Sequence, residues 1–397
     1  MSYDLQSLKK AIKFNALEVL PSDDTQLDKE LSFIIEKANT SGQLIRHYIG
    51  FEISGKIHLG SGIMTALKVK ALQEAGVVCT FWLADFHTWI NNKLDGKLET
   101  IDKVSREYFE PMMLECCRAV GCDVSKIEVL RATEVYETKV SGKPFFAFDL
   151  QVAKNLTLNR VLKSISVTGK KEEENVNFGI LRYPPMQVAD AFFMQTHIVH
   201  AGMDQRKCHV LMRETAPKLD YEYQLKIGGK PVAPIAVHHA LLLGLGKPDG
   251  DQGSRMRDEA MEDAKMSKSK PNTCIFPDDS EELIASKIKK AYCPMPNLEL
   301  QTIQEVENEQ KLNPILNWIE NMIMPIQGNF EIISREGLVS NYAQFHTLWS
   351  DYCSGLIHPV DLKSSLTVVL VKILEIPRTW ALENKLKLEL VESFAKK

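Results

Sequence analysis

A lone histidine stands among glycines in the segment SGKIHLGSG, residues 54–62. The segment follows an apolar run and precedes a helical pattern, so His58 is expected in the loop between a strand and a helix. The unpaired N–H groups and partial positive charge of a helix start favour phosphate. Gly55, Gly60 and Gly62 would let a nucleotide approach the backbone closely. His58 is therefore a candidate donor to charge developing on phosphorus. A tight turn whose histidine only caps or packs remains an alternative.

A second candidate segment is KMSKS, residues 265–269, within the polar stretch 247–272. Lys265, Lys268 and Lys270 lie in what reads as a mobile loop. Lysines on such a loop can close over a polyphosphate and neutralise it as pyrophosphate leaves. A solvated surface loop, or a phosphorylation target, is the alternative reading of the same residues.

The third candidate is YPPMQVADAFF, residues 183–193. Tyr183, Gln187 and Asp190 are spaced i, i+4 and i+7, which places them on one face of a helix. Three polar groups on an otherwise apolar segment are satisfied best by a bound polar ligand, unless that face is exposed to solvent.

The elements around these segments predict a parallel α/β sheet. Residues 43–51 read as a strand, 61–76 as a helix and 77–85 as a second buried strand. Strand, helix and strand in this order form the repeating unit of such sheets. Since ligands bind at the carboxyl ends of the strands, residues 48–60 and 83–87 are expected at the functional edge.

The rest of the chain reads as mostly helical. Residues 97–165 carry helical patterns, 197–202 read as a short strand, and a helix is expected after Ser280 as its cap. We expect an α/β domain over 1–280, with a helical insertion over about 100–195, and a helical domain over 281–397.

Composition excludes several classes of protein. The chain has 397 residues, of which 44% are hydrophobic and 25% charged, as in a globular protein. No apolar run is long enough to span a bilayer, and the N-terminal segment lacks a secretory core. Eight scattered cysteines without a CxxC pair disfavour a disulfide framework or a zinc site, which makes a reducing cytoplasm the default. The net charge of −4 disfavours binding of nucleic acid over the whole surface, but it leaves room for a local basic face.

KMSKS matches the second signature of the class I aminoacyl-tRNA synthetases, and HLGS resembles their HIGH motif. Within that class the chain resembles the archaeal and eukaryotic tyrosyl-tRNA synthetases. The resemblance is carried by these segments: YIGFEISGKIHLG, FWLADFHTWIN, YPPMQVADAFF, HAGMDQRKCHV, KIKKAYCP and HPVDLK. It implies a Rossmann-type parallel-sheet catalytic domain with a helical insertion, and an α-helical anticodon-binding domain at the C-terminus.

The resemblance also implies an enzyme that activates tyrosine with ATP to tyrosyl-adenylate and passes tyrosyl to the 3′ end of tRNA-Tyr. Tyr48 and Asp190 would hold the phenol hydroxyl of tyrosine. The ammonium would contact Tyr183, Gln187 and Gln205, and the pocket would be lined by Ala84 and His87. Such a site rejects phenylalanine by about 10⁴–10⁵, a magnitude established for tyrosyl-tRNA synthetases themselves.

ATP with Mg²⁺ is the implied co-substrate, with His58, Lys265 and Lys268 as the catalytic residues. The residues implied for ATP binding are Gly50, Glu52, Ser54, Gly55, His58, Gly60, Ser61, Lys265, Met266, Ser267, Lys268 and Ser269. Those implied for tRNA binding are Arg160, Arg206, Lys207, His358 and Asp361, with a structural ion pair as the alternative for Arg206. A homodimer formed through the insertion is a further expectation.

Two departures from the family pattern are visible. Ser61 replaces the last histidine of the HIGH motif, where it is expected to cap the helix and donate one hydrogen bond. The relatives' KFGG segment, which stacks an aromatic ring on the anticodon, is absent from ISREGLVSNYAQF, where Tyr342 or Phe345 would have to substitute. The competing readings are a tryptophan-specific synthetase, a small nucleotidyltransferase and a non-catalytic RNA-binding paralogue.

Overall fold

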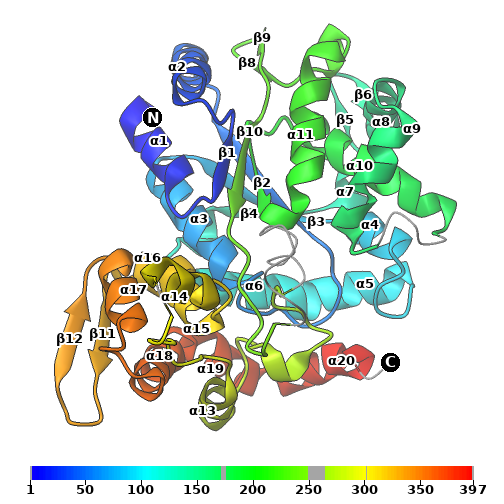
Figure 1. Cartoon of the computed structure of the whole chain (residues 1–397). Helices are drawn as coiled ribbons and strands as arrows, with labels where there is room; N and C mark the ends of the chain where they lie inside the picture. The colour runs from blue at the N-terminus through cyan, green and yellow to red at the C-terminus, as the bar shows by residue number, and fades with distance from the viewer. Residues whose placement is uncertain (1, 171–175, 249–263, 301, 396–397) are drawn as a thin grey trace.

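A six-stranded sheet forms the centre of the N-terminal half (Figure 1). The computed structural model describes residues 2–170, 176–248, 264–300 and 302–395. The sheet has the order β1-β10-β7-β2-β3-β4, and only the edge strand β1 runs antiparallel to its neighbour. The strands are β1 Glu18–Leu20, β2 Arg46–Phe51, β3 Val78–Leu83, β4 Ile127–Arg131, β7 Ile198–Gly202 and β10 Ile235–His239.

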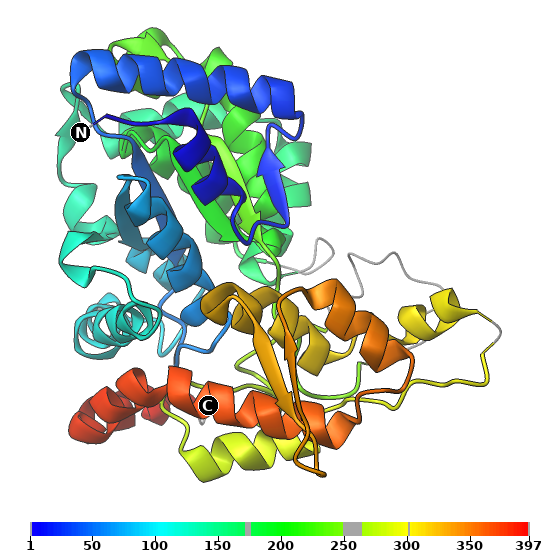
Figure 2. The ribbon, with the colours of Figure 1, turned by 90° about the vertical axis from the view of Figure 1, so that its left-hand side faces the viewer.

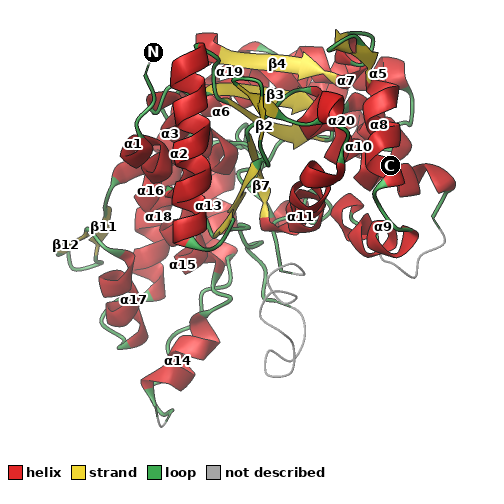
Figure 3. Cartoon of the chain, turned by 90° about the horizontal axis from the view of Figure 1, so that it is seen from above, coloured by secondary structure: helices red, strands yellow, loops and turns green. Residues whose placement is uncertain are grey.

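Helices cover both faces of this sheet. The strands run between α3 on one side and α10 and α11 on the other (Figure 3). The helices of this half are α1 Leu5–Lys13, α2 Asp24–Ser41, α3 Ile63–Glu74, α4 Asp85–Ile90, α5 Leu98–Val104, α6 Glu110–Ala119, α7 Ala132–Val135, α8 Phe145–Lys154, α9 Leu158–Ser164, α10 Phe178–Phe193 and α11 Arg206–Thr215. The predicted α/β class is confirmed.

The two-residue period of the strands decides which side chains reach the site. Ile49 and Phe81 join the core beneath α3, whereas Tyr48 and Trp82 point to the opposite face, toward α8 and α10. Gly50 is the register partner of Trp82, and Tyr48 is the partner of Thr80. The carboxyl ends of β2 and β3 therefore bring Tyr48 and Trp82 to the same face as α10.

The helix predicted after Ser280 is present and opens the C-terminal half as α13. Ser280 caps α13 by accepting a hydrogen bond from the backbone N–H of Leu283. The helices that follow are α13 Glu281–Lys290, α14 Ile303–Gln310, α15 Pro314–Trp318, α16 Met324–Gln327, α17 Phe345–Cys353, α18 Pro359–Ile373, α19 Glu375–Glu383 and α20 Lys385–Ala395. The last two return to the N-terminal half, where α19 packs on α6 and α20 on α5 (Figure 2).

Two expectations about secondary structure need correction. The insertion is not purely helical, because it supplies strand β4 to the main sheet and a small hairpin, β5 Lys139–Val140 with β6 Lys143–Pro144. The C-terminal half contains a hairpin, β11 Phe330–Ile333 with β12 Val339–Tyr342. A further short hairpin joins β8 Lys226–Ile227 to β9 Lys230–Pro231. Residues 249–263 of the polar stretch 247–272 lie outside the described residues.

Among the described residues, no helix is both long and apolar enough to cross a bilayer. All eight cysteines are described, and each of them is a free thiol.

Candidate active site

A cavity of about 290 Å³ opens at the carboxyl ends of β2 and β3, against α10. All seven residues predicted to hold tyrosine line it: Tyr48, Ala84, His87, Tyr183, Gln187, Asp190 and Gln205. The helix predicted from the i, i+4, i+7 spacing is present as α10, although Pro184 and Pro185 lie within it.

Asp190 is the buried carboxylate of this cavity. The indole Nε1 of Trp82 donates to its Oδ2 over 3.0 Å, and the Tyr136 hydroxyl donates to its Oδ1 over 2.5 Å. Burial raises the pKa of Asp190, and both hydrogen bonds oppose that rise. Since each oxygen retains a further lone pair, the carboxylate can also accept a hydrogen bond from a ligand.

Sequence reasoning missed Trp82 and Tyr136. Trp82 could have been found, because it lies two residues before Ala84 in the predicted strand 77–85, where alternate residues share a face. Tyr136 follows the short helix α7, and its approach to Asp190 depends on how β4 joins the sheet. No sequence pattern signals that contact.

Tyr48 and His87 complete the Asp190 end of the cavity. Burial and the negative charge of Asp190 raise the pKa of Tyr48, so its hydroxyl stays protonated. His87 Nε2 lies 3.8 Å from Asp190 Oδ2, and both ring nitrogens of His87 are buried without a partner. Burial lowers the pKa of His87 to about 3, so the imidazole is neutral. This end presents neutral donors and acceptors around one carboxylate.

The other end of the cavity carries amide groups. Gln187 Nε2 donates to Gln205 Oε1 over 3.3 Å, and Gln205 Nε2 donates to the Val167 carbonyl over 3.1 Å. Gln187 Oε1 is buried without a partner. The carboxylate of Glu52 also lines the cavity and accepts from Asn91 Nδ2 over 2.7 Å. An unused amide oxygen and a carboxylate suit a cationic ligand group.

A second cavity of about 520 Å³ adjoins the first, and both are lined by Ser54, His58, Ser61 and Lys268. Most residues predicted for ATP line it: Gly50, Ser54, His58, Gly60, Ser61, Lys265, Met266, Ser267, Lys268 and Ser269. Glu52 lines only the first cavity, and Gly55 lines neither. His58 therefore stands where two ligands held in the two cavities would meet.

Local hydrogen bonds shape the His58 turn. Its carbonyl accepts from the N–H groups of Ser61 at 3.0 Å and Gly62 at 2.9 Å. Ser61 Oγ bonds the N–H and the carbonyl of His58, at 3.2 and 3.1 Å. The expected capping of the helix by Ser61 is not made, because Gly62 is the N-cap of α3 and no side chain caps it. Ser61 instead tightens the turn that carries His58.

His58 itself is neutral and partly unsatisfied. Burial, with the nearby positive charges of Lys268 and Lys265, lowers its pKa to about 3, and its Nδ1 is buried without a partner. Gly62 has a packing role here, since a Cβ at this position would lie 2.7 Å from the sulfur of Cys116 on α6. The turn thus presents a neutral imidazole at the junction of the cavities.

The KMSKS segment lies beside the turn. Lys268 Nζ donates to Ser54 Oγ over 3.0 Å, and Lys265 Nζ pairs with Asp204 Oδ2 over 2.8 Å. The N–H of Met266 donates to the Leu242 carbonyl over 2.7 Å, which fixes the segment just past β10. Burial lowers the pKa of Lys268 to about 8.

The basic residues predicted for the tRNA end cluster on α9 and α11. Arg160 pairs with Glu214, and Lys207 Nζ donates to Ser166 Oγ over 2.8 Å. Arg206 Nε contacts both oxygens of Glu18, at 2.9 and 2.8 Å. The structural ion pair considered for Arg206 is therefore present.

The residues predicted for the anticodon lie at the start of α18. His358 is its N-cap, and its Nδ1 accepts from the N–H of Val360 over 3.1 Å. Asp361 is buried, and its Oδ1 accepts from Arg335 Nε over 3.1 Å. Arg335 belongs to the turn of the β11–β12 hairpin, which occupies the stretch that lacks KFGG.

Comparisons with known proteins place the chain in a family. The family model described as "tRNA synthetases class I (W and Y)" matches residues 40–375. The tyrosine–tRNA ligase of Thermococcus sibiricus is 40% identical over 357 residues, covering 89% of this chain and 91% of that protein. That of Thermococcus kodakarensis is 37% identical, covering 96% and 97%.

A solved structure is similar over nearly the whole chain. The tyrosyl-tRNA synthetase of Pyrococcus horikoshii, crystallised with L-tyrosine, superposes with a TM-score of 0.87 at 36% identity, covering 98% of this chain and 100% of that one. These relatives favour tyrosine over the tryptophan, nucleotidyltransferase and non-catalytic alternatives. The chain belongs to the class I tRNA synthetases for tryptophan and tyrosine, and to the tyrosine–tRNA ligases among them.

Proposed function

We propose that Tyr48 and Asp190 hold the phenol hydroxyl of the substrate tyrosine at the Trp82 end of the first cavity. The hydroxyl would donate to Asp190 and accept from Tyr48, whose own proton is retained. The observation that supports this proposal most directly is the buried carboxylate of Asp190, which accepts hydrogen bonds from two donors and lines the cavity. Phenylalanine would leave these polar groups unpaired, and that is costly in a buried site.

The substrate ammonium would lie at the opposite end. Gln187 Oε1 is buried and unpaired, which supports a role as its acceptor, with Tyr183 and Gln205 beside it. Tyrosine held in this way directs its carboxylate toward His58 and the second cavity. No general base is needed, because the substrate carboxylate is already ionised at neutral pH.

ATP would occupy the second cavity as its Mg²⁺ complex, with the metal carried on the phosphates. A carboxylate oxygen of tyrosine attacks the α-phosphorus, the bond to the β-phosphate oxygen breaks, and pyrophosphate leaves. The neutral imidazole of His58 donates a hydrogen bond to the α-phosphate, while Lys265 and Lys268 neutralise the departing pyrophosphate. Catalysis then consists of positioning and charge stabilisation.

In the second step, the terminal ribose hydroxyl of the tRNA attacks the carbonyl carbon of tyrosyl-adenylate and AMP leaves. Arg160, Arg206 and Lys207 are the proposed contacts to this end of the tRNA. Arginine can pair with a guanine edge through two hydrogen bonds. His358 and Asp361 are the proposed contacts to the first anticodon base, which assigns anticodon binding to residues 281–397.

We also propose a homodimer formed through the insertion. Phe146 and Leu150, one turn apart on α8, are 64% and 48% exposed, and Leu158 on α9 is 64% exposed. Exposed large apolar side chains in this part of the chain support a protein interface. The eight free thiols support a reducing, cytoplasmic location.

Tyrosine-dependent exchange of pyrophosphate into ATP tests the proposal directly. The wild-type enzyme should exchange with tyrosine and be nearly silent with phenylalanine or tryptophan. The Asp190→Asn variant should lose most tyrosine-dependent exchange, whereas Asp220→Asn, an exposed change on the same half, should not. Full activity in Asp190→Asn would refute the proposed phenol site.

A further inference from the structure

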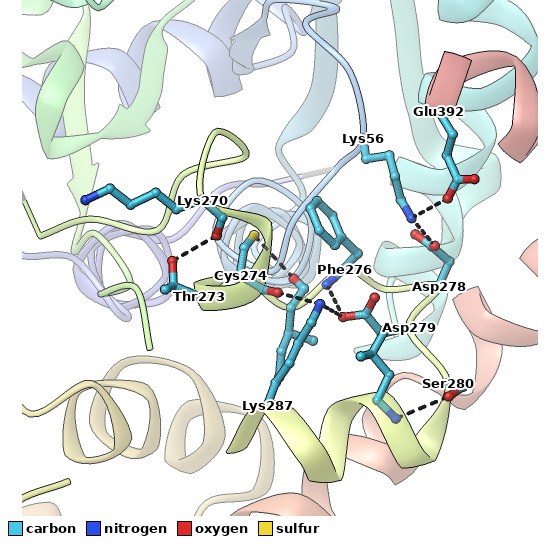
Figure 4. A network of polar contacts seen from close by, with 12 residues as sticks. Lys56, Lys270, Thr273, Cys274, Phe276, Asp278, Asp279, Ser280, Lys287 and Glu392 are labelled. Carbon is cyan, nitrogen blue, oxygen red and sulfur yellow. Dashed lines mark hydrogen bonds and ion pairs between the residues drawn. The ribbon is translucent and has the colours of Figure 1, made fainter. Parts of the chain in front are cut away.

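A polar network joins the His58 turn to the C-terminal half of the chain (Figure 4). At its centre is Lys56, two residues before His58. Its Nζ pairs with the carboxylate of Asp278 and, over 3.1 Å, with Oε1 of Glu392 on α20. The Lys56 side chain is only 13% exposed, and that of Asp278 only 4%. A buried ammonium of the active-site loop is thus neutralised by two distant parts of the chain.

The segment that carries Asp278 is itself firmly held. We refer to residues 274–279, between KMSKS and α13, as the connector. Lys287 of α13 donates to the Cys274 carbonyl over 2.8 Å and to Asp279 Oδ2 over 2.6 Å. The Phe276 ring contacts two ammonium groups, with Lys56 Nζ at 4.8 Å and Lys287 Nζ at 5.2 Å from its centroid. The connector is therefore fixed to α13 while it holds Lys56.

The backbone around His58 is anchored to the same surroundings. The N–H of Leu59 donates to the Ile275 carbonyl of the connector over 3.2 Å. The N–H of Ile57 donates to the Tyr108 hydroxyl, also over 3.2 Å. Both neighbours of His58 are thus bonded outside the turn, and Lys56 supplies the third anchor on the side of α20.

We propose that Lys56 is a positioning residue for tyrosine activation, through which the connector and α20 hold His58 at the junction of the two cavities. The inference rests on the proposed role of His58 in activation. Lys56 is not among the described residues that line either cavity, so it acts through the turn and not on a ligand. A buried ion pair adds little net stability, because desolvation offsets the attraction; its contribution here is geometric.

The charge state of Lys56 is consistent with this role. Burial alone would lower its pKa, but the carboxylates of Asp278 and Glu392 outweigh burial and raise it. The ammonium is therefore retained over the working pH range of the enzyme, and the anchor does not titrate away.

The mildest test is Glu392→Gln, because Glu392 is 45% exposed and its loss leaves the Lys56–Asp278 pair in place. We expect a fall in kcat of pyrophosphate exchange of about threefold to tenfold, with the KM values for ATP and tyrosine unchanged. Glu389→Gln, at an exposed position on the same helix, is the matched control and should behave as wild type.

Lys56→Met leaves Asp278 buried without a cation and risks misfolding. The double variant Lys56→Met/Asp278→Asn removes both charges and avoids that penalty. If Lys56 positions the turn, the folded double variant has a kcat at least about tenfold below that of the wild type, with near-normal KM values. Lys56→Arg, which keeps the positive charge, retains part of the lost kcat. Wild-type kcat in the double variant overturns the proposal, as does a raised KM for ATP with unchanged kcat.

A double-mutant cycle between Lys56 and His58 distinguishes this inference from the proposed function. In a His58→Ala background, loss of Lys56 should reduce exchange little further, because its effect passes through the missing ring. Equal reductions in both backgrounds would overturn the positioning role alone. Full activity in His58→Ala itself would instead contradict the role proposed for His58.

Discussion

The indole of Trp82 on β3 and the carboxylate of Asp190 on α10 are joined by a hydrogen bond of 3.0 Å at the buried end of the first cavity. This contact fixes one carboxylate oxygen, and the Tyr136 hydroxyl fixes the other. The orientation of Asp190 is therefore set before a ligand enters, which is the condition for discriminating a hydroxyl from its absence.

Replacing Trp82 by phenylalanine should weaken tyrosine recognition without emptying the pocket. A hydrogen bond to a charged group contributes about 1.5–3 kcal/mol, so kcat/KM for tyrosine should fall by about tenfold to a hundredfold. Phenylalanine does not use the carboxylate, so its exchange rate should change little and the ratio between the two amino acids should shrink. Trp89→Phe, at a half-exposed position on α4, is the control. An unchanged ratio would mean that Trp82 does not orient Asp190.

Titration of Lys268 should lower the rate of pyrophosphate exchange at mildly alkaline pH. Burial lowers its pKa to about 8, so the ammonium is present below that pH and is lost above it. We expect kcat/KM for ATP to fall as the pH rises through about 8, where an ordinary lysine would still be charged. The Lys268→Arg variant should lose this inflection, because arginine stays protonated. Lys270→Met, at the exposed position just after the KMSKS segment, should keep the inflection.

Buried histidines should make the fold sensitive to acid. Burial lowers the pKa of His47 to about 3 and that of His197 to about 4. Their stabilising effect is complete above the unfolded pKa of about 6.5 and is lost as the pH falls below it, since only the unfolded chain then binds protons. The limiting slope is about 1.4 kcal/mol per pH unit for each histidine.

His47 offers the cleanest test, because both its ring nitrogens are buried without a partner. His47→Leu should lose little stability at pH 7.5 and should flatten the fall in unfolding free energy between pH 6.5 and 5. Urea titrations at each pH measure this, with the exposed His346→Gln as control. Buried carboxyls with raised pKa act in the opposite direction, so the difference between variants is the diagnostic quantity. Parallel curves for His47→Leu and wild type would contradict the expectation.

The sequence predicted the site better than the sheet around it. Tyr183, Gln187 and Asp190 were placed by helical spacing, and Tyr48 with His58 by their position at strand ends. β4 was missed because it is an edge strand whose residues are mostly half-exposed, so it lacks a continuous apolar run. The β11–β12 hairpin was missed because its strands have only four residues each.

Contacts between segments that are distant in the chain could not be predicted from the sequence. The pairs Arg206–Glu18 and Arg335–Asp361 each join a predicted residue to one that no local pattern singles out. Periodicity reports which face a residue occupies, but not which segment comes to lie opposite. The same limit applies to Tyr136, whose phenol reaches Asp190 only because the insertion adds β4 to the sheet.

Asp361 should affect tRNA charging but not amino-acid activation. It lies at the start of α18, far along the chain from both cavities, and its Oδ1 is occupied by Arg335. If its remaining oxygen reads the first anticodon base, Asp361→Ala should lower kcat/KM for charging by about fivefold to a hundredfold, the effect of losing a base contact of about 1–3 kcal/mol. The loss should shrink when that base is changed in the tRNA transcript. Pyrophosphate exchange should be unaffected, and Glu331→Ala on the exposed face of β11 should change neither reaction. A parallel fall in exchange and charging would instead assign Asp361, through its pair with Arg335, to holding the hairpin against α18.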